Sequence, residues 1–186
     1  MVSLKYGKEY RIDKNYSGIG KQKMVYVGPY FDYDMSEDEH SNCRKWLLGL
    51  GVVSVVLFIF AVSFYSNLSR VWFVSIPFVC NAAVLFVYIS SFSYFYKWKT
   101  SLTREEHDKG GNRIKTCALA SLFFTSISCI GAVIAFFDFL EEVNLCDYIF
   151  FTLALCIIAL SAYELHKAKV INYVERPNPL AEEYKD

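Results

Sequence analysis

The sequence lacks the short motifs that mark many enzymes and metal proteins. It contains no Cys-x-x-Cys pair, no His-Glu-x-x-His motif, no Gly-x-Ser-x-Gly elbow and no Walker-type loop. Only three histidines occur among 186 residues. We interpret one of them, His40, as part of a solvated helix start. These absences argue against a thiol oxidoreductase, a zinc protease and a serine hydrolase. We therefore expect no catalytic residue, no metal site and no cofactor.

Charge is also missing from four long stretches. They are Trp46–Tyr65 with 20 residues, Val71–Tyr96 with 26, Thr116–Phe137 with 22 and Tyr148–Tyr163 with 16. A hydrocarbon core about 30 Å thick takes about 20 helical residues to cross. The first three stretches are long enough. The fourth is long enough if it extends to Ile171 while Glu164, at its polar end, reaches out to the membrane interface.

These stretches have no polar face, as helices of a soluble bundle would need. We therefore predict an all-α membrane protein, with a four-helix transmembrane bundle in residues 36–171. The expected helices are about 37–66, 71–97, 115–139 and 147–171. Residues 1–35 would form a tyrosine-rich cytoplasmic juxtamembrane segment and residues 172–186 a cytoplasmic tail, of which Glu182–Asp186 would be solvated. Because proline interrupts helices, Pro177 and Pro179 predict that this tail contains no further helix.

The basic residues are distributed on one side of the predicted bundle. Of the 19 Lys and Arg residues, eight precede the first helix, six lie between the second and third, and four follow the fourth. Only Arg70 falls elsewhere. The positive-inside rule then places both chain ends and the central loop of a multi-pass membrane protein in the cytoplasm. The last outer loop is a candidate acidic surface, formed by Asp138, Glu141, Glu142 and Asp147.

The third helix carries two stripes of contrasting size. Small residues recur at helical spacing at Ala118, Ser121, Thr125, Ser128, Ala132 and Ala135. Bulky residues follow a similar rhythm at Phe123, Ile127, Ile130, Ile134 and Phe137. In lipid, helices associate through close backbone approach, so the small stripe should face the protein. The alternative is a polar path lined by Ser121, Thr125 and Ser128.

Two residues of the second helix stand out. Pro77 cannot donate a backbone hydrogen bond, so a kink is expected there. Asn81 lies ten residues in from Val71, roughly 15 Å deep by helical rise. A side-chain amide at that depth needs a partner. We expect an interhelical hydrogen bond, with contact to a ligand or an ion as the alternative.

The polar segments also contain local signals. Ser36 with Glu39 and Thr103 with Glu106 have the form of capping boxes, and the second would open a short helix ending at Gly110. A small N-terminal β-hairpin is expected from Tyr10–Ile12, a turn around Ser17–Gly20 and Met24–Val27. The alternative is a flexible juxtamembrane tail.

Two short runs carry a family resemblance. Tyr26-Val27-Gly28-Pro29-Tyr30-Phe31 precedes the first helix, and Leu102-Thr103-Arg104-Glu105-Glu106-His107 precedes the third. With these runs the chain resembles a group of small uncharacterised bacterial membrane proteins with four transmembrane helices. The resemblance implies a bacterial plasma membrane and supplies no activity.

Two function classes follow from these patterns. The first is an accessory or assembly subunit whose polar segments contact a protein partner. The second is a small channel or transporter formed by a homo-oligomer, with Asn81 and the hydroxyls of the third helix along its path. The expected surroundings are the lipid bilayer and a protein partner or further copies of the chain, and no nucleic acid.

Overall fold

The transmembrane bundle is confirmed by a computed structural model, which describes residues 4–13, 24–96, 98–138 and 143–183. The helices long and apolar enough to cross a membrane contain α1 (Glu37–Ser63), α2 (Trp72–Phe95), α4 (Gly111–Asp138) and α5 (Leu145–Ala168). Their ends agree with the sequence-based ranges to within four residues. A short 3-10 helix, η2 (Leu68–Arg70), connects α1 to α2 at the end of the bundle far from the termini.

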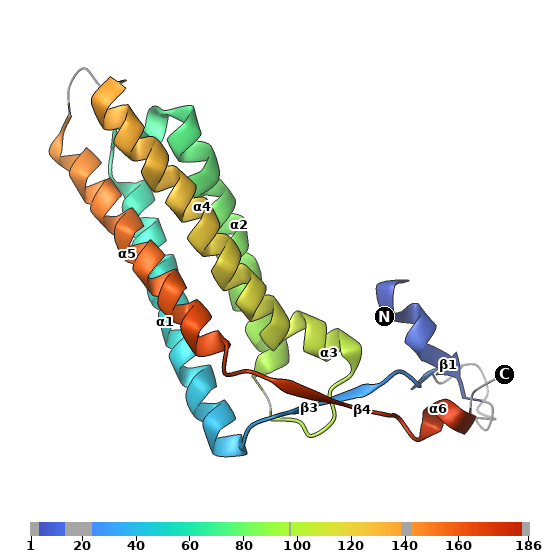
Figure 1. The fold of residues 1–186 in the computed structure, drawn as a ribbon. Helices are drawn as coiled ribbons and strands as arrows, with labels where there is room; N and C mark the ends of the chain where they lie inside the picture. Colours follow the sequence, from blue (N-terminus) through green and yellow to red (C-terminus); the bar gives the residue numbers. More distant parts are fainter. Residues whose placement is uncertain (1–3, 14–23, 97, 139–142, 184–186) are drawn as a thin grey trace.

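The four long helices form a closed ring (Figure 1). Helix α4 packs between α2 and α5, and α1 completes the ring by contacting the same two helices. The small stripe of α4 faces inward, as predicted, because Ala118, Ser121, Thr125, Ser128, Ala132 and Ala135 are each at most 1% exposed. The bulky stripe faces outward, with Ile130 62% and Phe137 85% exposed.

Capping fixes where several helices begin. Both predicted capping boxes are present, Ser36 with Glu39 at α1 and Thr103 with Glu106 at α3 (Arg104–Lys109). A third box, which the sequence analysis missed, joins Asn144 and Asp147 at the start of α5. These reciprocal bonds satisfy backbone N–H groups that a helix start leaves unpaired.

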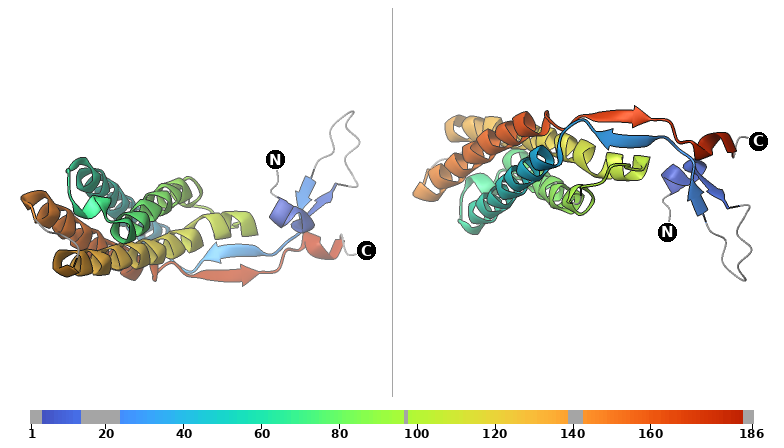
Figure 2. Two further views of the ribbon diagram at one scale, coloured as in Figure 1. Left: turned by 90° about the horizontal axis from the view of Figure 1, so that it is seen from above. Right: turned by 90° about the horizontal axis from the view of Figure 1, so that it is seen from below.

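A second structural unit, which we call the arm, leads away to the side of the bundle (Figure 2). It comprises residues 4–13, 24–36 and 171–183. Its elements are η1 (Leu4–Glu9), β1 (Tyr10–Ile12), β2 (Met24–Tyr26), β3 (Tyr30–Tyr33), β4 (Tyr173–Arg176) and α6 (Leu180–Glu183). The predicted hairpin is confirmed in its strands, since β1 pairs antiparallel with β2 and Tyr10 lies opposite Tyr26. Its turn, around Ser17–Gly20, lies outside the described residues.

The chain after the bundle differs from the predicted tail. Strand β4 pairs antiparallel with β3, so that Tyr33 lies opposite Tyr173 and Tyr30 opposite Arg176. The prediction of no further helix after Pro177 is wrong, because α6 follows Pro179 directly. Proline interrupts a helix that is under way, but it fits the start of one. Asn178 supports this start by accepting a 3.0 Å hydrogen bond from the backbone N–H of Leu180.

An aromatic cluster joins the arm to the bundle. The ring of Tyr33 lies 5.3 Å from Trp98 and 5.2 Å from Tyr173, between ring centroids. His40 packs into the same cluster, 4.6 Å from Tyr33 and 4.6 Å from Phe95, and is 1% exposed. The interpretation of His40 as part of a solvated helix start is therefore wrong. Glu37, Asp38 and Glu39 at the start of α1 are exposed, but the side of the helix that carries His40 is covered by Tyr33 of the arm, for which the strands carry no sequence signal.

Candidate functional site

A layer of polar side chains crosses the interior of the bundle. The apolar core is divided into two clusters, one around Leu47, Tyr88 and Ile114 near the arm and one around Ala61, Phe78 and Phe150 farther away. Between them along the helices lie six buried polar residues, which we call the polar layer: Ser54, Asn81, Ser121, Thr125, Ser161 and Glu164. Each of the four long helices contributes at least one of them.

The ionisable member of the layer is Glu164 of α5. It is 1% exposed, and its Oε1 accepts a 3.0 Å hydrogen bond from the hydroxyl of Ser54 on α1. The expectation that Glu164 reaches out to the interface is wrong. Side chains tilt toward the N-terminus of their helix, and the N-terminus of α5 lies at the far end of the bundle. The carboxyl group is therefore directed inward, away from the nearer interface.

A second hydrogen bond extends the layer to α4. The hydroxyls of Ser121 and Ser161 lie 2.9 Å apart, and one donates to the other. Ser161 precedes Glu164 by three residues, so the two side chains share one face of α5. The layer thus runs from Ser54 through Glu164 and Ser161 to Ser121.

The helix register brings Asn81 to the same level. Ser128 of α4 donates a 2.8 Å hydrogen bond to the backbone oxygen of Val74 on α2. These helices are antiparallel, so two turns along each lead from Val74 to Asn81 and from Ser128 to Ser121. Asn81 and Ser121 therefore occupy facing positions of α2 and α4.

Two members of the layer have unmet hydrogen-bonding groups. Within the described part of the chain, both amide atoms of Asn81 and the hydroxyl of Thr125 are buried without a hydrogen-bond partner. The expected interhelical hydrogen bond of Asn81 is thus not formed. Buried unpaired polar groups are costly and are uncommon in folded proteins.

The arm side of the layer is closed by close packing. The ring of Tyr88 lies over Gly51, where a Cβ atom would overlap it. The Tyr88 hydroxyl donates a 3.0 Å hydrogen bond to the backbone oxygen of Leu47 on α1. Gly51 is one helical turn from Ser54, so Tyr88 packs directly beside the layer.

Asp147 was predicted to lie on an exposed acidic surface, but it is buried. This residue is 0% exposed and accepts hydrogen bonds from the Ser66 hydroxyl at 2.7 Å and the Leu68 backbone N–H at 3.2 Å. It ties α5 to the α1–α2 connection. Asp138 is exposed at the end of α4. Glu141 and Glu142 lie outside the described residues.

Pro77 and Ser128, the remaining predicted residues, are not part of the polar layer. Pro77 lies inside α2, half-buried, and its predicted kink stays a prediction. Ser128 is occupied by its bond to α2 rather than directed to the layer. Among the described residues, no three His, Cys, Asp or Glu side chains gather as they would to hold a metal ion.

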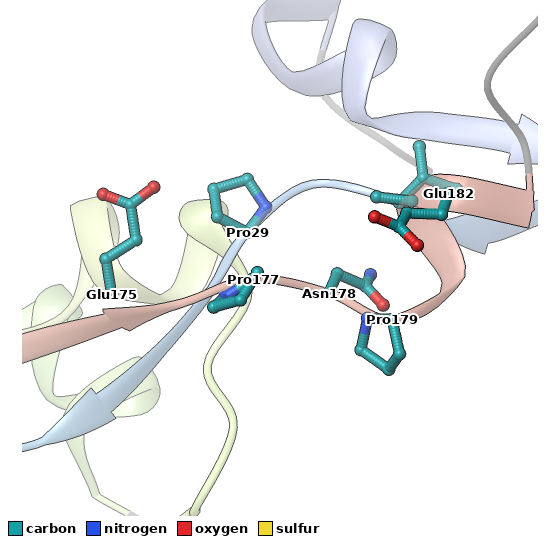
Figure 3. A pocket seen from close by; sticks show the side chains of 8 residues that line it. Pro29, Glu175, Pro177, Asn178, Pro179 and Glu182 are labelled. Atoms are coloured by element: carbon teal, nitrogen blue, oxygen red, sulfur yellow. The ribbon is translucent and has the colours of Figure 1, made fainter.

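The arm contains a groove of about 570 Å³ where two turns meet (Figure 3). Its walls are Val27 and Pro29 before β3, and Glu175, Pro177, Asn178, Pro179, Ala181 and Glu182 from the C-terminal segment. Asn178 holds the two walls together by donating a 2.9 Å hydrogen bond to the backbone oxygen of Tyr26.

The arm is braced against α3 at several points. The hydroxyl of Tyr26 donates to the Pro29 oxygen at 2.7 Å and accepts from the Arg104 backbone N–H at 3.0 Å. Burial raises the pKa of Tyr26 above that of a free tyrosine. Arg104 pairs with Glu9 at 2.9 Å, and Lys5 pairs with Asp108 at 3.0 Å, which raises the pKa of Lys5.

The inward position of Glu164 was missed, although a signal for it exists. In α5 the buried residues recur at spacings of four and three, through Phe150, Ala154, Ile157, Ser161, Glu164 and Ala168. This is the rhythm that identified the inward stripe of α4. Comparison of the chain with protein-family models, with curated proteins and with solved structures finds no match.

Proposed function

We propose that the chain is an accessory subunit of a membrane complex, and that its arm binds a neighbouring membrane protein. The main support for this proposal is the position of the arm, which extends sideways from one end of the bundle. A segment held beyond the four helices is accessible to another protein.

The bracing of the arm supports this role. Backbone hydrogen bonds of 2.9 Å in both directions join Phe31 of β3 to Leu102, in the connection before α3. Together with the Arg104–Glu9 pair, they couple the arm to the base of the bundle. A rigid arm presents its groove in one orientation, and such pre-organisation reduces the entropy lost on binding.

The charge balance of the arm and its flanks favours a protein over lipid headgroups. Residues 1–36 and 169–186 contain nine basic and eight acidic residues. Anionic membranes attract segments with a clear basic excess, which this balance lacks. Exposed apolar side chains at Ile12, Met24 and Val174 suit a protein contact.

The basic residues also support an orientation for this proposal. The arm and the α2–α4 connection lie at one end of the bundle, and 13 of the 14 Lys and Arg residues that the structure describes belong to the segments at that end. We therefore assign the arm to the cytoplasmic side of the plasma membrane. A reporter fused after residue 186 that gives an extracellular signal would overturn this orientation.

Native purification in a mild detergent tests the proposed binding. The wild-type chain should co-elute with a larger membrane protein, and Ala181→Arg should abolish this by filling the groove. Asn172→Arg is the matched control, because Asn172 is exposed on the arm outside the groove and should tolerate the change. Elution of the wild-type chain only as a monomer or homo-oligomer would contradict the proposal.

The polar layer favours a second candidate, a channel or transporter formed by several copies. Polar and ionisable residues buried within membrane helices commonly mark an ion pathway. Reconstitution in liposomes separates the two functions, since only this one gives ion flux without a partner. If Asn81→Leu leaves such a flux unchanged, Asn81 does not line the path.

A further inference from the structure

We propose that the polar layer binds a monovalent cation, a proton or a sodium ion, at the Glu164 carboxyl group. This inference goes beyond the proposed function, because it holds whether or not the arm has a partner. It is based on the contacts of Glu164, the free lone pairs of neighbouring hydroxyls and the two unpartnered side chains of the layer.

The Glu164 carboxyl group has no positively charged partner in the polar layer. No Lys, Arg or His contributes to the layer, and the ion pairs of the described chain are all formed elsewhere. A carboxylate buried in apolar surroundings is strongly disfavoured unless a positive charge accompanies it. One carboxylate with neutral neighbours is matched in charge by one monovalent cation.

The polar layer contains oxygen atoms that could bind a cation. The hydroxyl hydrogen of Ser54 is used in its bond to Glu164, and one hydrogen of the Ser121–Ser161 pair is used between them. Each hydroxyl oxygen has two lone pairs, so acceptor capacity remains beside the carboxyl group. Oxygen atoms of carboxyl, hydroxyl and amide groups are the ligands that hard cations prefer.

Asn81 and Thr125 have buried hydrogen-bonding groups that are not satisfied. Both are 0% exposed, and neither has a partner within the described residues. Asn81 faces the position of Ser121, and Thr125 lies one helical turn farther along α4. The side chain of Thr125 tilts toward the N-terminus of α4, and hence toward Ser121. These unmet polar groups lie at the level of the hydroxyl pair along the helices, where a bound ion with its water would satisfy them.

The titratable groups around Glu164 do not supply the missing charge. Tyr88 of α2 is close enough to Glu164 to interact with it electrostatically, and its hydroxyl group is neutral when protonated. On α5 itself, Lys167 lies over the rings of Trp46 and Tyr163 rather than toward the layer.

The full-length protein in lipid nanodiscs can be treated with dicyclohexylcarbodiimide, an apolar reagent that modifies protonated carboxyl groups. Peptide mass spectrometry should find Glu164 modified, and exposed carboxyl groups such as Glu37 and Glu175 unmodified. Above the pH at which half of the Glu164 carboxyl groups are ionised, labelling of Glu164 should fall about tenfold per pH unit, because only the protonated form reacts. Ser54→Ala should increase labelling at a fixed pH, because the ionised form loses a hydrogen bond. Ser63→Ala is the matched control, since Ser63 is exposed on α1 and bonds only to the backbone of its own helix.

Sodium and choline chloride at equal ionic strength distinguish the two ions. Protection of Glu164 by sodium alone assigns the site to sodium, and pH-dependent labelling that sodium leaves unchanged assigns it to the proton. Glu164→Gln should remove the part of the dependence of the unfolding temperature on pH or sodium that Glu164 contributes, while it preserves the shape of the side chain. The proposal is overturned if the folded wild-type protein shows no modification of Glu164 at any pH. It is overturned equally if wild type and Glu164→Gln respond identically to pH and to sodium.

Discussion

Asp147, at the start of α5, accepts a 2.7 Å hydrogen bond from Ser66, which lies in the connection between α1 and α2. The same carboxylate accepts a 2.9 Å bond from the backbone N–H of Asn144 and so completes the cap of its own helix. One side chain thus stabilises a helix start and a contact between segments about 80 residues apart.

Replacing Asp147 should therefore destabilise the bundle. Asp147→Ala leaves the buried Ser66 hydroxyl without its acceptor and the Leu68 N–H with only its 3.1 Å bond to the Ser66 hydroxyl oxygen. We expect a loss of about 2–4 kcal/mol in unfolding free energy. Denaturant unfolding in detergent micelles measures it. Asp138→Asn, at an exposed position, should change stability by less than about 0.5 kcal/mol. Equal effects of the two changes would contradict the assigned role of Asp147.

Gly51 and Gly49 form a matched pair on α1. A methyl group at Gly51 would overlap the Tyr88 ring, whereas at Gly49 nothing lies within 4 Å. Gly51→Ala should cost about 1–3 kcal/mol through overpacking. Gly49→Ala should be neutral or slightly stabilising, because alanine favours the helix. Thermal unfolding of both variants tests the contact, and an unaffected Gly51→Ala would show that α1 and α2 are farther apart.

The arm should weaken at alkaline pH. Burial raises the pKa of Tyr26, Tyr33 and Tyr173 above the value of about 10 for a free tyrosine. Above that pH the unfolded segment loses protons that the folded arm retains, so the stability of the arm falls as pH rises. Below it the contribution is fully present. Phenolate absorbance should show a late-titrating group of tyrosines, and Tyr26→Phe should reduce that group. Titration of every tyrosine near pH 10 would refute the burial.

The contact between Phe31 and Leu102 should control how often the arm opens. Leu102→Pro removes the N–H that donates to the Phe31 oxygen, and we expect the opening free energy of β3 and β4 to fall by about 1–3 kcal/mol. Hydrogen exchange of backbone amides measures this locally, and α4 should be unaffected. Leu102→Val keeps the N–H and controls for the side chain. If both variants exchange alike, the backbone bonds contribute little.

The bundle could be predicted because its signals are local. A long stretch of residues without charge identifies a membrane-spanning helix. Small residues that recur at helical spacing indicate which side of α4 faces inward. Ser36 and Thr103 marked helix starts for the same reason, since a capping box is complete within four residues.

The misses involve contacts between distant segments. Nothing near Tyr33 indicates that it pairs with Tyr173, about 140 residues later. His40 packs against Tyr33, so its burial could not be predicted from the sequence near His40 either. Glu164 was misplaced for a different reason. Its distance from the helix end suggested the interface, whereas the tilt of its Cα–Cβ bond directs it inward.

The pairing of β3 with β4 also sets an order of events during biosynthesis. Strand β3 is synthesised before the first long helix and β4 after the last one, so the ribbon can close only when all four helices have left the ribosome. Until then β3 has an unpaired edge, of the kind that promotes association with other chains. Insertion of an even number of membrane-crossing helices brings the two strands to the same end of the bundle, where they can pair.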